Sequence, residues 1–377
     1  MDIWKKAVEY AQQRSEHFWL KCTAAAALVL FAGLIYAGSA YQTREAEEQL
    51  ASFQIKENWS FYEKIANSAQ IEILVVGDNI GGGLGVNSSD QTWYSHVQAK
   101  LRTLYNASLD FDLNPTGAPT VLDGLVDYAM SQTKEKYDLV FVCFGYFDQE
   151  YTSMSEFSRH YEQLIRTLKE EKKNPEIYVI IEHNMYNDQY AEEIKKLSHY
   201  YDVPYVDTRG AESVAKAADS SEIYPDEEGQ HLYSNAIIQV IEQQLRKGKT
   251  VVYEGKEPLQ KLEENPRLET NFKMSTGFRK AGRLYMARNT KERLTLQTEG
   301  RPLGVIISRS LESGLLHVYV DGNKVMSIDC YGPERVQNYW FPHKFEDGPH
   351  TIVLEVSDQQ RVEKGGGGAD VLGIIVN

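Results

Sequence analysis

The chain has 377 residues, of which 40 are basic, 54 are acidic and 42% are hydrophobic, and its formal net charge is -14. At about 150 residues per domain, this length predicts two domains with room for an extra segment, and the composition excludes a disordered chain and a multi-span membrane protein. The acidic excess argues against a nucleic-acid partner, and three cysteines cannot build a disulfide framework.

One strongly apolar segment lies near the amino terminus, where Cys22 to Ala40 contain no charged residue. At about 1.5 Å per residue, a helix of this length spans the roughly 30 Å hydrocarbon core of a bilayer. We therefore predict a transmembrane helix over residues 22–41. Basic residues precede it and acidic residues follow it, so the positive-inside rule predicts a cytoplasmic leader over residues 1–21 and an extracytoplasmic bulk.

Two alternatives compete with this uncleaved signal-anchor. A cleavable signal peptide is the stronger one, because Gly38, Ser39 and Ala40 are small residues of the kind that signal peptidases accept. The long charged leader and the length of the apolar segment favour the anchor. A buried helix of a soluble domain is the weaker alternative, because such a helix is rarely apolar on every face. The prediction is a single-pass protein of the cell membrane with a cytoplasmic amino terminus.

The exported part is predicted to begin with a charged helical stalk over residues 42–68 and to continue as an α/β domain over residues 69–248. Buried strands alternate with amphipathic helices in the second range. The strands are predicted at 71–78, 137–145, 176–183 and 203–208, and the helices at 92–105, 155–172, 191–202 and 231–248. This alternation predicts a parallel sheet covered by helices, with any active site at the carboxyl ends of its strands.

Residues 250–377 contain no helical pattern and are predicted to form an antiparallel β-sandwich. Period-two strands are expected at 293–300, 303–310, 315–331, 350–357 and 371–377, and Asp321-Gly322 predicts a hairpin turn. Cys143 and Cys330 lie in predicted core strands, where single buried thiols are expected. Four aromatic residues are candidates for stacking on sugar rings, with core packing as the alternative: Tyr331, Tyr339, Trp340 and Phe341.

A glycine-rich loop, VVGDNIGGGLG, covers residues 75–85 after the first predicted strand. A dinucleotide fingerprint needs G-x-G-x-x-G at the start of a helix, and a P-loop needs a Lys after its last Gly. The loop has neither pattern, so no nucleotide cofactor is predicted. His183 and His231 also lack the close spacing to carboxylates that a metal site requires, so no metal is predicted.

Four blocks within residues 70–245 resemble those of the SGNH/GDSL hydrolases. The family's G-D-S-L block falls on Gly77-Asp78-Asn79-Ile80, its second-block Gly on Gly117, its G-x-N-D block on Gly145-Tyr146-Phe147-Asp148, and its D-x-x-H block on Glu228-Gly229-Gln230-His231. This resemblance implies a flavodoxin-like three-layer α/β domain. It also implies a cleft lined by Asp78, Gly117, Gly145, Phe147 and Asp148.

The same resemblance implies that essential catalytic groups are missing. In the family, a Ser attacks an ester carbonyl, a His removes its proton, an Asp orients the His, and backbone N–H groups with an Asn side chain hold the oxyanion. Here Asn79 stands at the nucleophile position and Phe147 at the oxyanion Asn position. A carboxamide is a poor nucleophile and a phenyl ring donates no hydrogen bond. His231 and Glu228 are interpreted as a vestigial pair of the triad.

Three hypotheses for function follow. The preferred one is a non-catalytic, membrane-anchored descendant that binds or scaffolds cell-surface glycan or polysaccharide machinery, because the resemblance implies a carbohydrate or cell-envelope partner. The alternative is an active O-acetyl esterase or acyltransferase on surface glycan, with an atypical catalytic constellation. A third is a structural protein that assembles through its sandwich.

Overall fold

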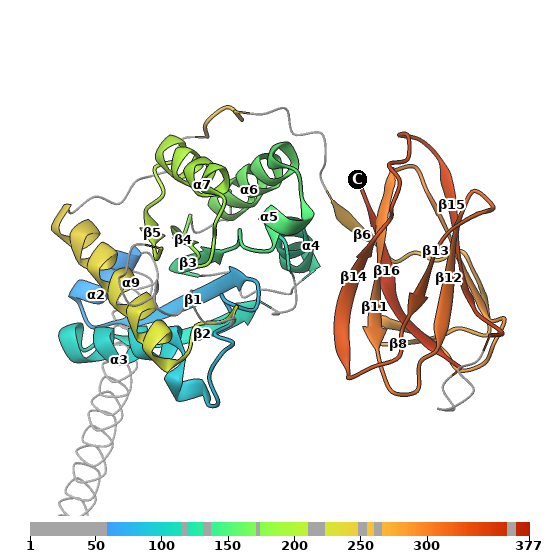
Figure 1. Cartoon of the computed structure of the whole chain (residues 1–377), viewed down its shortest axis with the longest axis horizontal. Coiled ribbons are helices and arrows are strands. Elements are labelled where there is room, and N and C mark those ends of the chain that lie inside the picture. Colours follow the sequence, from blue (N-terminus) through green and yellow to red (C-terminus); the bar gives the residue numbers. More distant parts are fainter. Residues whose placement is uncertain are drawn as a thin grey trace, which may run out of the picture. The chain divides into compact units, whose positions relative to one another are not determined.

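The computed structural model of the chain describes residues 59–114, 119–130, 137–170, 174–209, 223–247, 255–259, 266–359 and 367–377 (Figure 1). The predicted leader, the predicted transmembrane helix over residues 22–41 and most of the predicted stalk lie outside the described residues. Within these ranges, no helix is both long and apolar enough to cross a membrane. From Ser60 onward the chain forms one structural unit.

The α/β domain is built on a five-stranded sheet in which all neighbouring strands are parallel. Its strand order, β2-β1-β3-β4-β5, is the flavodoxin-like order that the resemblance implies. The strands are β1 (Gln70–Gly77), β2 (Ser108–Asn114), β3 (Leu139–Cys143), β4 (Glu176–Ile181) and β5 (Tyr205–Asp207). Apolar runs form β1, β3 and β4, which are covered on both faces and buried along most of their length.

Helices cover both faces of this sheet, so the domain has three layers (Figure 1). One face carries α2 (Phe61–Ala66), α3 (Trp93–Tyr105) and α9 (Glu227–Lys247). The other face carries α4 (Val121–Met130), α6 (Met154–Lys169) and α7 (Asp188–Tyr200). Successive residues of β1 serve the two faces in turn, because side chains alternate along a strand: Ile73 packs with the first group of helices and Leu74 with the second. Two short helices, η1 (Ser89–Gln91) and α5 (Asp148–Tyr151), lie in connecting loops.

The last residues of the predicted stalk belong to α2, which packs on the sheet. Ser60 and Glu63 form a capping box that starts this short helix. Lys64 then reaches the carboxylate of Asp138, with 2.8 Å between Nζ and Oδ2, and both side chains are buried. The chain therefore joins the α/β domain before β1 begins.

The helix predicted from residue 231 begins earlier, at Glu227. Asp226 accounts for this start, because its Oδ1 accepts a hydrogen bond from the N–H of Gly229 at 2.9 Å, as an N-cap residue does. Glu228 therefore lies in the first turn of this helix, ahead of the predicted start, and His231 lies farther along it.

The predicted β-sandwich is confirmed, and its two sheets are antiparallel. One has the order β13-β12-β15-β10-β7 and the other β14-β11-β16-β9-β8, with β6 also paired to β16. The strands are β6 (Arg267–Glu269), β7 (Met274–Thr276), β8 (Arg279–Ala281), β9 (Leu284–Ala287), β10 (Arg293–Thr298), β11 (Pro302–Arg309), β12 (Leu315–Val320), β13 (Asn323–Asp329), β14 (Arg335–Trp340), β15 (His350–Val356) and β16 (Ala369–Val376). Asp321 and Gly322 both have positive φ, as a tight hairpin turn requires.

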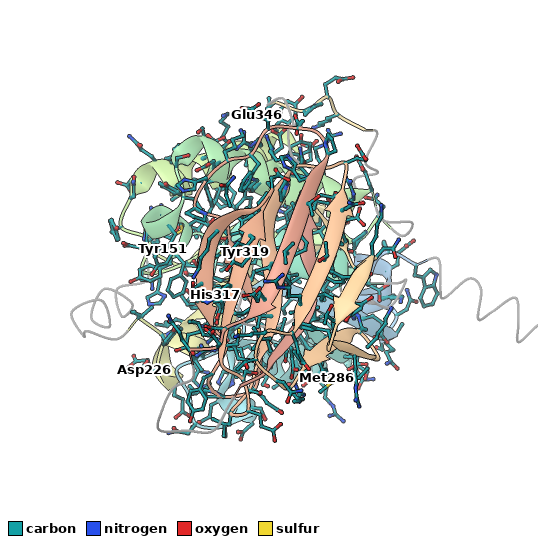
Figure 2. The ribbon with its side chains drawn as sticks, turned by 90° about the vertical axis from the view of Figure 1, so that its right-hand side faces the viewer. Tyr151, Asp226, Met286, His317, Tyr319 and Glu346 are labelled. Carbon is teal, nitrogen blue, oxygen red and sulfur yellow. The ribbon has the colours of Figure 1, made fainter. Side chains whose placement is uncertain are left out.

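The side chains of the sandwich divide between a core and an outer face. On β12, His317 and Tyr319 alternate with fully buried neighbours and lie on the outer face of their sheet (Figure 2). Tyr339 and Phe341 instead pack against the core, so core packing explains these two candidates for sugar stacking. The indole N–H of Trp340 donates a hydrogen bond to Asp123 Oδ1 of α4 at 2.7 Å. Two free cysteines, Cys143 and Cys330, are buried as predicted.

Candidate binding site at the carboxyl edge of the parallel sheet

The glycine-rich loop turns tightly at the end of β1. An added Cβ at Gly77 would lie 2.9 Å from the carbonyl oxygen of Cys143, and one at Gly81 would lie 3.0 Å from Cys143 Cβ, so both positions favour glycine. Asp78 is fully buried and its Oδ1 accepts hydrogen bonds from the N–H groups of Ile80 (2.7 Å) and Gly81 (3.3 Å). These bonds fix the backbone of Asn79, whose side chain is half-buried at the surface of the loop.

The polar partner of Asn79 is a tyrosine that the sequence does not suggest. Asn79 Nδ2 donates to the hydroxyl of Tyr224 at 3.3 Å. The loop is held against this residue at Gly85, which has a φ of +116° and approaches Pro225 so closely that a Cβ would lie 2.3 Å from its carbonyl oxygen. The nucleophile position thus faces a phenol in the segment before α9.

His231 lies on the exposed side of α9, where its ring stacks on His96 of α3 with centroids 3.7 Å apart and planes at 18°. Desolvation, followed by the nearby His231, lowers the pKa of His96. The neighbouring Gln230 takes the inward position: it is fully buried, and its Oε1 accepts from the N–H of Trp93 at 2.8 Å. Its Nε2 donates to carbonyl oxygens of both the glycine-rich loop and the segment before α9. Glu228 is exposed in the first turn of α9.

The third block forms the loop after β3. Gly145 has a φ of +147°, and a Cβ there would lie 2.6 Å from Met185 Sδ. Phe147 is half-buried and its ring stacks parallel to that of Tyr151, with centroids 6.4 Å apart. Asp148 is fully buried and accepts the N–H of Val121 with both carboxylate oxygens, at 3.1 and 3.2 Å. The loop thereby holds the start of α4, while Gly117 lies outside the described residues.

A second buried carboxyl, Glu182, lies beneath these loops at the end of β4. It accepts hydrogen bonds from the N–H of Tyr146 at 2.6 Å and from Cys143 Sγ at 3.4 Å, and it lies within hydrogen-bonding reach of Asp78. Asp78 Oδ2 has no N–H or O–H donor in the described part of the chain. Burial, followed by the proximity of Glu182, raises the pKa of Asp78, and burial raises the pKa of Glu182. One proton shared by the two carboxyl groups satisfies this arrangement.

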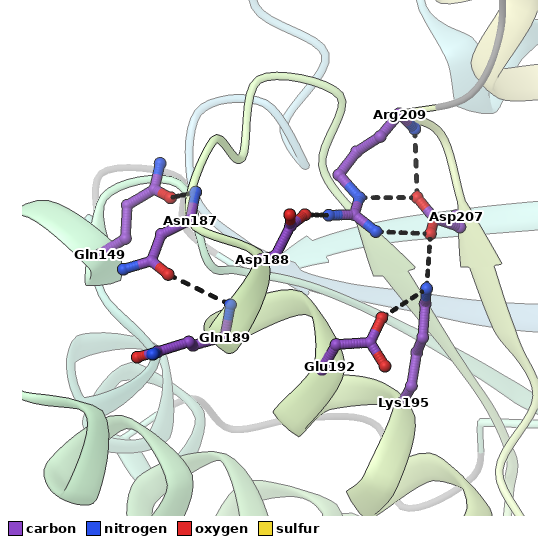
Figure 3. Close-up of polar contacts among 8 residues, drawn as sticks. All are labelled: Gln149, Asn187, Asp188, Gln189, Glu192, Lys195, Asp207 and Arg209. Atoms are coloured by element: carbon purple, nitrogen blue, oxygen red, sulfur yellow. Dashed lines mark hydrogen bonds and ion pairs between the residues drawn. The ribbon is translucent and has the colours of Figure 1, made fainter.

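A polar network fixes the neighbouring loop after β4 (Figure 3). Asn187 donates its N–H to Gln149 Oε1 at 3.0 Å. Its side-chain oxygen accepts a hydrogen bond from the N–H of Gln189 and so caps the start of α7.

Farther along the same edge, Arg209 pairs with Asp188 and Asp207 at 2.9 Å each. Lys195 bridges Glu192 and Asp207 at 2.9 and 3.2 Å. Ion pairs that are partly exposed stabilise the fold little, but together they define where the loop lies.

In the described ranges, no group of three or more His, Cys, Asp or Glu side chains is arranged to hold a metal ion. His183 follows Glu182 at the end of β4, and its Nδ1 lies 2.8 Å from the hydroxyl of Tyr233. Burial lowers the pKa of His183 to about 4, so its imidazole is neutral near pH 7.

A three-layer domain with a glycine-rich turn after its first strand and a G-x-x-D loop after its third defines an SGNH-hydrolase-like domain. Residues 75–232 match the family model described as GDSL-like lipase/acylhydrolase. No curated protein matches the chain in sequence.

Among solved structures, the chain is similar to a two-domain esterase active on acetylated mannans, co-crystallised with mannopentaose. The TM-score is 0.67 at 14% identity, over 83% of this chain and 93% of that one. A second structure of the same esterase gives a TM-score of 0.65 at 14% identity, with the same coverage. A family 3 carbohydrate esterase of Clostridium thermocellum gives 0.39 at 16% identity, over 47% and 98% of the two chains. The likeness to the two-domain esterase extends over most of both chains and shows a shared fold.

Proposed function

We propose that this protein is a non-catalytic member of its family that binds cell-surface glycan at the carboxyl edge of the parallel sheet, anchored to the cell membrane through residues 22–41. The observation that carries the proposal is the environment of Asn79. An amide stands at the nucleophile position, and its hydrogen-bond partner is the hydroxyl of Tyr224.

Ester hydrolysis by the family route needs a nucleophile, a general base beside it and an oxyanion donor. The nitrogen lone pair of Asn79 is delocalised into its carbonyl, so the side chain cannot attack an ester. The imidazole of His231 stacks on His96, and the side chain that α9 directs to the loops is Gln230. Phe147 offers no hydrogen bond to an oxyanion, and loss of one such donor alone lowers the rate by about 10²–10³.

Two observations support a glycan as the ligand. The two-domain esterase of similar fold acts on acetylated mannans, so this combination of domains occurs in a protein that recognises polysaccharide. The net charge of -14 disfavours a polyanionic ligand and suits a neutral or cationic glycan.

The activity test uses the purified full-length chain and p-nitrophenyl acetate. We expect hydrolysis at the rate of buffer alone for the wild-type chain. We expect the same for Asn79→Ser, because Phe147 would still occupy the oxyanion Asn position and the ring of His231 stacks on His96. The matched control is Ser88→Ala, which removes a serine from the same loop. Turnover by the wild-type chain that His231→Ala abolishes would establish the O-acetyl esterase or acyltransferase alternative and end the non-catalytic proposal.

A further inference from the structure

Large apolar side chains are exposed around the proposed binding edge. Four of them lie in the segments there: Leu84 (48% exposed), Tyr151 (71%), Tyr186 (67%) and Ile223 (39%). These residues follow β1, β3 and β4 and precede α9, so four separate segments contribute to one edge. Tyr146, Phe147 and Tyr224 are half-buried on the same segments. Exposed apolar patches on a protein surface commonly mark interaction sites.

The aromatic rings of this edge are held in place before any ligand arrives. Phe147 stacks on Tyr151 with planes at 9° and meets Tyr146 edge to face at 5.0 Å. The hydroxyl of Tyr186 donates to Glu150 Oε1 at 2.5 Å, which joins the loop after β4 to α5. Tyr224 is held by the hydrogen bond that its hydroxyl accepts from Asn79 Nδ2. Rings that are already oriented lose little entropy on binding.

Polar groups alternate with these rings. Glu150 lies next to Tyr151, Asn184 lies two residues before Tyr186, and Gln149 lies between Phe147 and Tyr151 in sequence. Amide and carboxylate groups beside aromatic faces suit a ligand with an apolar C–H face and a rim of hydroxyl groups.

The charges at the edge restrict the ligand further. Glu150 and Asp226 are acidic, and Arg209 and Lys195 are engaged in the ion pairs of the neighbouring network. A polyanion would meet repulsion here, whereas a neutral chain would not.

We infer that the loops after β1, β3 and β4 and the segment before α9 form an aromatic platform, made of Tyr146, Phe147, Tyr151, Tyr186 and Tyr224, on which the pyranose rings of a neutral glycan stack. The inference rests on the proposed function, because it assigns the ligand class and the contact residues of that same edge. The exposed rings of Tyr151 and Tyr186 supply the stacking faces, and Glu150 and Asn79 supply hydrogen bonds to sugar hydroxyls.

The test measures binding of mannopentaose, cellopentaose and chitopentaose by isothermal titration calorimetry, with polygalacturonate as the anionic comparison. The full-length chain is kept in a zwitterionic detergent without a sugar headgroup, because a glycosidic detergent would compete. We expect Tyr151→Ala and Tyr186→Ala each to weaken binding of the preferred neutral probe about tenfold. Tyr151→Phe keeps the ring and is expected to retain wild-type affinity.

Tyr319→Ala is the matched control, because it removes a tyrosine from the outer face of the sandwich (Figure 2) and should leave affinity unchanged. Tyr151 is 71% exposed, so its loss should leave the thermal midpoint of unfolding unchanged.

Binding of a neutral probe that survives both alanine substitutions overturns the platform but leaves the proposed glycan function standing. Absence of binding to every neutral probe overturns the glycan function itself. Self-association in light scattering that Tyr151→Ala abolishes, without glycan binding, identifies the patch as a contact between copies and overturns the platform.

Discussion

The Lys64→Met substitution is expected to lower the free energy of unfolding by about 3–5 kcal/mol. Lys64 and Asp138 form an ion pair with only 9% and 2% of their side chains exposed, and Asp138 Oδ2 also accepts the N–H of Glu72 at 2.8 Å. The substitution removes the ammonium group that lies 2.8 Å from this buried carboxylate and leaves the carboxylate desolvated. Because α2 is the first described helix, the same pair fixes the entry of the chain into the α/β domain.

Urea-induced unfolding of the full-length chain, followed by far-ultraviolet circular dichroism, measures this loss. Lys196→Met is the control, because Lys196 is 58% exposed in its pair with Glu193 and such pairs contribute about 0–1 kcal/mol. The double variant Lys64→Met/Asp138→Asn should recover most of the lost stability, since it removes both buried charges. A loss for Lys64→Met as small as that for Lys196→Met would show that the pair is not buried in solution.

The central strands of both domains can be predicted from the sequence, because their apolar residues form continuous or strictly alternating runs. The edge strands give a weaker signal. β2 reads SLDFDLN and alternates as a half-buried strand does, but aspartate is rare in strands, the run is short, and β2 pairs on one side only, so it is absent from the predicted strands. α4 contains Gly124, a poor helix former, and the structure explains why it is there: an added Cβ would lie 2.2 Å from the ring of Phe144. Contacts between distant segments determine which residue is accepted at such positions, and the local sequence pattern does not reveal those contacts.

The candidate site divides in the same way. Asn79 and Phe147 can be located in advance because each lies in a short motif directly after a buried strand. Glu182 carries a weak signal, since it is a carboxylate at the end of an apolar strand. The local sequence gives no indication of the roles of Tyr224 and Gln230, because their hydrogen bonds to Asn79 and Trp93 join segments more than a hundred positions apart in the chain. The direction of His231 also depends on where α9 starts, which Asp226 determines.

Buried carboxyl groups should make the protein less stable as the pH rises from about 4.5 to about 7. Burial raises the pKa of Asp127 and of Glu176 to about 7, and it also raises those of Asp78, Glu182 and Asp148. At these five carboxyl groups the native state keeps protons that the unfolded chain has already lost, and their sum exceeds the opposite contribution of His183, whose pKa is lowered to about 4. The free energy of unfolding therefore falls as pH increases, by on the order of 2–4 kcal/mol between pH 5 and pH 8. Urea unfolding of the full-length chain at these pH values checks the slope.

The Glu182→Gln variant isolates the part of this slope that comes from the shared proton. The amide oxygen of Gln can still accept the N–H of Tyr146, and its NH₂ group can donate to an ionised Asp78. The loops of the candidate site should then tolerate higher pH, and stability should fall less between pH 5 and pH 8 than in the wild-type chain. Glu228→Gln, on the exposed side of α9, is the control and should keep the wild-type slope. Equal slopes for wild type and Glu182→Gln would mean that Asp78 and Glu182 share no proton.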